Sequence, residues 1–243
     1  MNFCSYEYII ICSYIVKIIL QCHNMQGKEF NMLLDKDIRE PLFDFLEDTF
    51  GQIRILEEKK TGRSRADVVM VTPEHVIGIE IKSDADTYAR LDSQVRDYSL
   101  YYDRNLVAVG SRHAMNIEKH VPDSWGIITI DEVDGEADFY LLRYPSENPS
   151  FKHDKLISTL WRPELNRLLA INELPRYPAK SKAFVIAALA ERVPWETLLP
   201  QITEELFQRD YTTIADEINA YREEHGKKPR TARRKRRRRR KTV

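Results

Sequence analysis

Two short runs of β-branched residues, separated by a turn, constrain the fold of this chain most. Residues 66–71 read ADVVMV, residues 76–82 read VIGIEIK, and T-P-E-H lies between them. Runs of this kind on either side of a proline-containing turn predict a β-hairpin. If the turn centres on Pro73-Glu74, residues whose numbers sum to 147 face each other. Asp67 is then predicted to lie directly opposite Glu80.

Three polar side chains are predicted on one face of this hairpin. Lys82 shares a face with Glu80, because residues two apart in a strand point the same way. The facing carboxylates of Asp67 and Glu80 repel each other, and a hard divalent cation removes that cost. The ammonium of Lys82 can offset negative charge that develops on a phosphate in the transition state. The group therefore predicts a phosphodiester-cleaving site, whereas the alternative reading makes Asp67 a loop end and Lys82 a solvated strand end.

The remaining periodicities predict a mixed sheet with helices packed against it. Residues 35–48 place Ile38, Leu42 and Leu46 at helical spacing. The other predicted elements are a strand at 52–56, a helix at 86–104, buried strands at 105–109 and 126–130, one or two helical turns within 114–120, and an edge strand at 139–144. An α-β-β-β-α-β-α-β order of this kind is typical of an α/β (mixed α+β) fold.

The character of the sequence changes after P-S-E-N-P-S at residues 145–150. Helices separated by prolines are predicted at 154–171, 180–192, 195–208 and 212–225. We therefore expect the α/β domain to span residues 32–147 and a helical module to span residues 152–226.

A strongly basic tail is concealed by a net charge of zero. Residues 227–243 hold 12 Lys or Arg and no acid, which leaves 26 basic against 38 acidic residues in the rest of the chain. Arginines in a disordered tail release counterions from phosphates and add affinity without sequence choice. Arg234, Arg236 and Arg238 are therefore predicted nucleic-acid contacts. A nuclear-localisation-like patch, RNA binding and an acidic partner are the alternatives.

At this point the motifs resemble a known superfamily. Asp67, followed after twelve residues by Glu80-Ile81-Lys82, resembles the signature of the PD-(D/E)XK nucleases. The segment Gln94-Val95-Arg96-Asp97-Tyr98 is similar to the Q-x-x-x-Y element of their RecB-like branch. The resemblance covers about residues 35–131 and implies a restriction-endonuclease-like αβββαβ core. The superfamily's proline before the first aspartate is replaced by Ala66.

The resemblance also implies roles for individual residues. Asp67 and Glu80 would be metal ligands, and Lys82 the catalytic lysine. Gln94 and Tyr98, one helical turn apart, would face the site and contact substrate or brace the acids. Glu40, on the first helix, matches an acidic residue that many members place near the metal.

The implied activity is that of a Mg²⁺-dependent nuclease, with Mn²⁺ as an alternative ion and DNA as the favoured nucleic acid. Arg90 lies four residues before Gln94 and therefore on the same helical face, and Arg96 is a second candidate phosphate contact. A protein with the same fold that binds nucleic acid without cutting it is the alternative. The sequence leaves open whether the chain forms a homodimer.

Other function classes find no support in the sequence. With 8 Gly and neither G-x-x-x-x-G-K nor G-x-G-x-x-G, no nucleotide cofactor is expected. Cys4, Cys12 and Cys22 show no zinc or disulfide spacing, so a reducing cytoplasm is expected. The apolar run at 8–20 is shorter than the roughly 18–20 residues that cross a bilayer. Residues 1–31 are therefore expected to form an apolar extension, and a membrane-tethered nuclease is kept as a third hypothesis.

Overall fold

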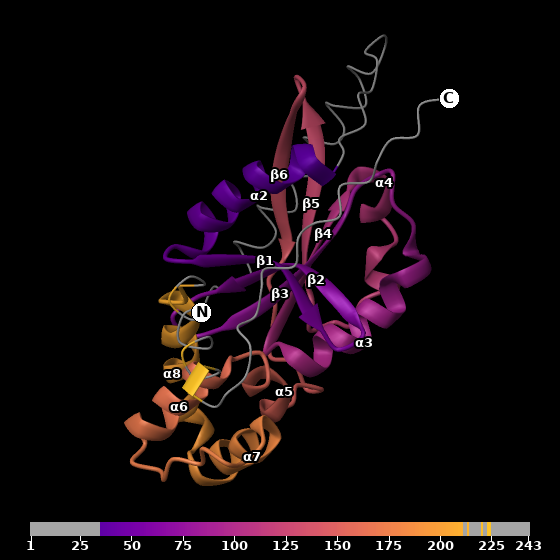
Figure 1. Cartoon of the computed structure of the whole chain (residues 1–243). Helices are drawn as coiled ribbons and strands as arrows, with labels where there is room; N and C mark the ends of the chain where they lie inside the picture. Colours follow the sequence, from indigo (N-terminus) through magenta and orange to yellow (C-terminus); the bar gives the residue numbers. More distant parts are fainter. Residues whose placement is uncertain (1–34, 211–212, 214–219, 221–222, 225–243) are drawn as a thin grey trace, which may run out of the picture.

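One six-stranded mixed sheet forms the centre of the protein (Figure 1). The structure is a computed structural model, which describes residues 35–210, 213, 220 and 223–224. The strands follow the order β1-β2-β3-β4-β5-β6, in which β3–β4 and β4–β5 are parallel and the other pairs antiparallel. They are β1 (Arg54–Thr61), β2 (Ser64–Val71), β3 (Val76–Lys82), β4 (Arg104–Gly110), β5 (Gly126–Val133) and β6 (Glu136–Arg143). The predicted mixed α+β class is confirmed.

The hairpin of β2 and β3 has the predicted register. Val68 pairs with Ile79 and Val71 with Val76, so the partner numbers sum to 147. Thr72 closes the turn, because its hydroxyl accepts a hydrogen bond from the backbone N–H of His75 at 2.9 Å. β3 is buried along its whole length, as expected for a central strand covered on both faces.

Two helices cover opposite faces of the sheet (Figure 1). α2 (Asp35–Phe50) buries Ile38, Leu42 and Leu46 against one face. α3 (Leu91–Tyr101) covers the other face. Successive strand residues alternate between faces, and the side chains of Ile77, Ile79 and Ile81 pack with α2. The even-numbered residues of β3 therefore point toward α3.

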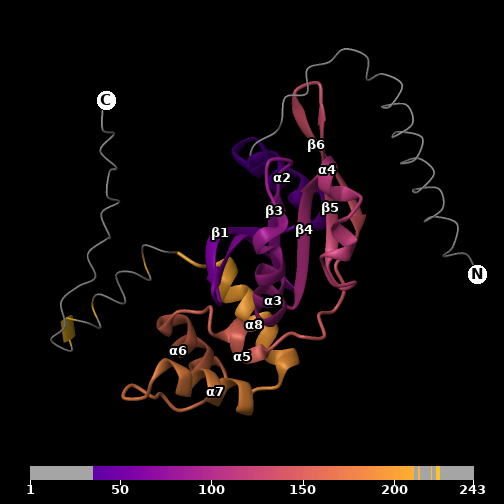
Figure 2. The ribbon, with the colours of Figure 1, turned by 90° about the vertical axis from the view of Figure 1, so that its right-hand side faces the viewer.

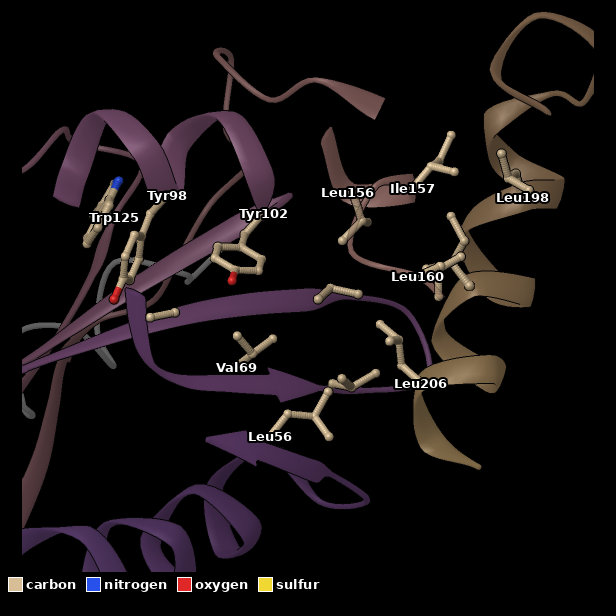
Figure 3. Close-up of a cluster of buried hydrophobic side chains, with 14 of the residues drawn as sticks. Leu56, Val69, Tyr98, Tyr102, Trp125, Leu156, Ile157, Leu160, Leu198 and Leu206 are labelled. Carbon is tan, nitrogen blue, oxygen red and sulfur yellow. The ribbon is translucent and has the colours of Figure 1, made fainter. Parts of the chain in front are cut away.

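The helical module packs on the α3 side and shares its hydrophobic core (Figure 3). Leu160 and Leu206 lie in the same cluster as Val69 and Tyr102 of the α/β region. The Thr203 hydroxyl donates a hydrogen bond to the carbonyl of Pro73 in the β2–β3 turn at 2.9 Å. The module consists of α5 (His153–Ile157), α6 (Arg162–Ile171), α7 (Lys182–Arg192) and α8 (Trp195–Phe207). α6 and α7 lie at the end of the molecule farthest from the β5–β6 tip (Figure 2). The two predicted regions thus form one continuous body.

The prediction of a single helix at 154–171 is wrong. α5 and α6 are separate, because α6 begins afresh at Arg162 with a proline in its first turn. The Glu164 carboxylate accepts a hydrogen bond from the backbone N–H of Trp161 at 2.6 Å, which caps the new helix.

The predicted helix at 86–104 is shorter than expected. The Asp86 carboxylate accepts hydrogen bonds from the backbone N–H and the hydroxyl of Ser83, which forms a turn after β3. A 3-10 turn, η1 (Tyr88–Arg90), then precedes α3, and the extended backbone of Tyr102 ends that helix.

The other boundaries move by a few residues. β1 begins two residues later than predicted and extends to Thr61, and β6 begins at Glu136. Of the helical turns in this region, η2 (Ile117–Lys119) lies within the predicted 114–120, whereas α4 (Ser111–Ala114) begins three residues before it. The apolar extension at 1–31, most of the predicted helix at 212–225, and the tail with Arg234, Arg236 and Arg238 lie outside the described residues. None of the described helices is long and apolar enough to cross a membrane.

Candidate metal centre

The structure brings Asp67, Glu80 and Lys82 together on the α3 face of the sheet. The Nζ atom of Lys82 donates a hydrogen bond to Oε1 of Glu80 at 2.5 Å. Oδ2 of Asp67 accepts a hydrogen bond from the backbone N–H of Ile81 at 3.0 Å, which fixes its carboxylate beside β3. The shared face follows from the register of the hairpin and from the two-residue spacing of Glu80 and Lys82.

Two residues of α3 hold Glu80 in place. The Gln94 side-chain amide donates to Oε1 of Glu80, and its carbonyl oxygen accepts from Nζ of Lys82 at 3.2 Å. The Tyr98 hydroxyl donates to Oε2 of Glu80 at 2.5 Å and accepts from the backbone N–H of Asp67 at 3.2 Å. Residues four apart on a helix lie one above the other, so Gln94 and Tyr98 reach the same carboxylate. Each Glu80 oxygen therefore has a protein donor.

Burial makes these contacts strong. Glu80 is 1% exposed and Lys82 5%, and a buried charge requires a partner. The Asp67 side chain is 21% exposed and is therefore more accessible to solvent than that of Glu80. Burial, followed by the negative charge of Glu80, raises the pKa of Asp67 to about 7. Burial and the charge of Glu80 also raise the pKa of Tyr98, so its hydroxyl stays protonated as a donor.

The first helix supplies an arginine to the site and not the predicted acid. Glu40 is exposed, and within the described part of the chain its carboxylate makes no hydrogen bond or ion pair. Its neighbour Arg39 places Nη2 3.9 Å from Oδ1 of Asp67. The helical spacing in the sequence already indicated this difference, because Ile38 and Leu42 define the inward side of α2. At 3.6 residues per turn, position 40 falls on the opposite side, whereas position 39 flanks the inward stripe.

The predicted phosphate contacts are accessible. Arg90, at the end of η1, and Arg96, on α3, are both exposed. Arg65, next to the site on β2, is 68% exposed and forms an ion pair with Glu58 at 2.5 Å. Exposed arginines of this kind can follow a phosphate backbone.

The acidic side chains of the site carry oxygen atoms, the donor type that Mg²⁺ prefers. Among residues 35–210, no group of three or more His, Cys, Asp or Glu side chains is arranged to hold a metal ion. Mg²⁺ is usually held by one or two carboxylates, with water and substrate phosphate completing its shell. The two acids of the site are Asp67 and Glu80, and the oxygens of Glu80 already accept hydrogen bonds from Lys82, Gln94 and Tyr98.

Comparison with known proteins places the whole described body in one family. No curated protein matches the chain. The family described as Bacteriophage P4 protein cII matches residues 28–230, which include the sheet, the five residues of the site and the helical module. The chain therefore belongs to the bacteriophage P4 cII protein family.

Proposed function

We propose that this protein is a Mg²⁺-dependent nuclease that hydrolyses phosphodiester bonds of nucleic acid, with DNA as its substrate. One observation carries the proposal: two acids and a lysine meet on one sheet face, and a glutamine and a tyrosine from α3 hold the inner acid. The order α2-β1-β2-β3-α3-β4 and the PD-(D/E)XK resemblance support a restriction-endonuclease-like core.

Each residue of the site has a proposed role. Asp67 and Glu80 hold the ion, which supplies Lewis-acid polarisation of the phosphate when bound. Lys82 offsets the negative charge that develops in the transition state. Gln94 and Tyr98 fix the orientation of Glu80, because both donate hydrogen bonds to its carboxylate.

The charge distribution supports a nucleic-acid partner. Outside residues 227–243 the chain has 26 basic and 38 acidic residues. This acidic excess repels phosphate, so a nucleic-acid substrate requires cationic side chains near the site. We assign phosphate contacts to Arg90 and Arg96, whose side chains are exposed. The cysteine spacing supports a reducing compartment, the cytoplasm, as the place of action.

A second function, nucleic-acid binding without cleavage, is favoured by one feature of the site. Lys82, Gln94 and Tyr98 together occupy both oxygens of Glu80, which is 1% exposed. If Glu80 serves only to hold these three side chains, it maintains the fold. A metal ion would then have Asp67 as its only carboxylate ligand from this pair.

A cleavage assay separates the two functions. Full-length protein is incubated with labelled duplex, single-stranded and branched DNA and with RNA, in Mg²⁺, Mn²⁺ or EDTA. We expect cleavage of DNA in Mg²⁺ or Mn²⁺ but not in EDTA, and a loss of about 100-fold or more in Lys82→Ala. The exposed Lys119→Ala variant, purified in parallel, controls for contaminating nucleases and should cut like the wild type. If the wild type binds DNA but cuts no better than Lys82→Ala in any metal, the binding function replaces the enzyme.

A further inference from the structure

Asp67 lies where the sheet is interrupted on both sides. The β2–β3 pairs end at Val68–Ile79, one step before Asp67 would pair with Glu80. On the β1 side, the register places Glu58 opposite Asp67, but this pair is missing between its paired neighbours. Glu58 has a φ of 54°, in the left-handed region that side chains rarely adopt. The strand alone therefore does not hold Asp67.

Side chains from the two helical layers take the place of the missing strand contacts. The backbone N–H of Asp67 donates to the Tyr98 hydroxyl of α3 at 3.2 Å. The carbonyl of Asp67 accepts from Nη1 of Arg39, on α2, at 3.4 Å. The peptide groups of the candidate ligand are thus held from opposite faces of the sheet.

Arg39 also joins the acids around this interruption. Its Nη1 donates to Glu57 at 3.3 Å and its Nη2 to Glu58 at 3.2 Å, while Nη2 lies 3.9 Å from Oδ1 of Asp67. The side chain is 16% exposed, so these contacts are partly shielded from water. A planar guanidinium with five donors can serve several oxygens in a fixed geometry, which a lysine ammonium on a flexible stem cannot do.

We propose that Arg39 is a positioning residue of the site, which fixes the Asp67 carboxylate by bridging Asp67 to Glu57 and Glu58 at the place where the Glu58–Asp67 strand pair is missing. Its consequence for catalysis rests on the proposed nuclease function. Arg39 is not needed to dock α2, because Ile38, Leu42 and Leu46 bury that helix against the sheet.

The backbone N–H of Ile81 reports directly on the Asp67 carboxylate, to which it donates at 3.0 Å. Its hydrogen exchange is measured by NMR in the full-length protein, without metal, for Arg39→Met, Arg39→Lys and the control Lys60→Met. Lys60 is an exposed residue of β1, so its variant removes the same charge from the same region. We expect Ile81 to exchange about three- to tenfold faster in Arg39→Met, since one hydrogen bond is weakened. Ile77, which pairs with Met70 in the same strand, should be unchanged.

Each outcome decides the inference. Ile81 should exchange as fast in Arg39→Lys as in Arg39→Met, because the bridge needs the planar guanidinium. A wild-type exchange rate of Ile81 in Arg39→Lys would show that positive charge alone suffices and would overturn the inference. Unchanged Ile81 exchange in Arg39→Met, or an equal change in Lys60→Met, would also overturn it.

The catalytic consequence is a split between kcat and KM. Arg39→Met should lower kcat about 10- to 100-fold, as a displaced ligand does, and leave KM for DNA within about twofold, because the guanidinium is engaged with Asp67, Glu57 and Glu58. Lys60→Met should leave kcat unchanged. An unchanged kcat in Arg39→Met would overturn the catalytic part. If the wild type cuts nothing, the proposed function fails, and Ile81 exchange still decides whether Arg39 positions Asp67.

Discussion

Replacing Asp67 with Asn should stabilise the metal-free protein at alkaline pH. Burial and the charge of Glu80 raise the pKa of this carboxyl from 3.8 to about 7, so the folded state binds the proton more tightly than the unfolded state. The stability contributed by that proton is complete below pH 3.8 and is lost as the pH rises through 7. At about 1.4 kcal/mol per pH unit, the ionised group costs the folded state up to about 4 kcal/mol above pH 7.

Asp67→Asn removes this cost and keeps an oxygen that can accept from Ile81. We expect the variant to be about 2–4 kcal/mol more stable than the wild type at pH 8.5, and the difference to fall to about half of that value at pH 5.5. Urea denaturation followed by circular dichroism, in EDTA and at constant ionic strength, measures the difference at both pH values. A difference that is the same at pH 5.5 and 8.5 would refute the reasoning, because the Asp67 charge would then carry no cost in the folded state.

Mg²⁺ should narrow the difference in stability between the two proteins. A ligand that binds only the folded state at 100 times its Kd stabilises by about 2.7 kcal/mol. Wild-type protein at pH 8.5 should therefore gain stability as Mg²⁺ is added, with NaCl at matched ionic strength as the control, and Asp67→Asn should gain much less. Equal gains in both proteins would show that Asp67 is not a metal ligand.

Three further changes test the packing of the sheet and of the helical module by urea denaturation. Tyr98→Phe removes the hydroxyl that joins Glu80 to Asp67 and should cost about 1–3 kcal/mol; a neutral result would contradict the bridging role. Gly78→Ala should cost about 1–3 kcal/mol, because the added Cβ would lie 2.2 Å from the Tyr102 ring; wild-type stability would mean that the ring moves away freely. Glu164→Gln should cost about 3–5 kcal/mol, since it leaves the 5%-exposed Arg209 without its carboxylate; a cost below about 1 kcal/mol would mean that water reaches this ion pair.

The hairpin was predictable because local chemistry determines it. The run from Val76 to Lys82 is the most continuous β-forming segment of the chain, and its observed bounds are those predicted. The turn then sets the register, and the register places Asp67 and Glu80 side by side. Gln94 and Tyr98 were found through a motif on a neighbouring helix whose spacing repeats once per turn.

The contacts that the sequence did not predict join residues far apart in the chain. Arg39 meets Asp67 across 28 positions, and Arg209 meets Glu164 across 45. No local pattern determines such a pairing, because it depends on how α2 and α8 pack against the rest of the molecule. Glu40, which the family resemblance implied as a ligand, lies outside the site for a local reason, since the helical spacing already placed it outward.

The shared core also determines how the protein can be divided. A truncated form that ended near residue 150 would lose Leu160, Leu198 and Leu206. Val69 and Tyr102 would then be exposed to solvent, and the truncated protein would be prone to aggregate. The α/β region and the helical module should consequently melt in one transition, and a protease should find no resistant fragment consisting of the sheet alone. The small helices are thus a structural requirement of the sheet beneath them, whatever else they contact.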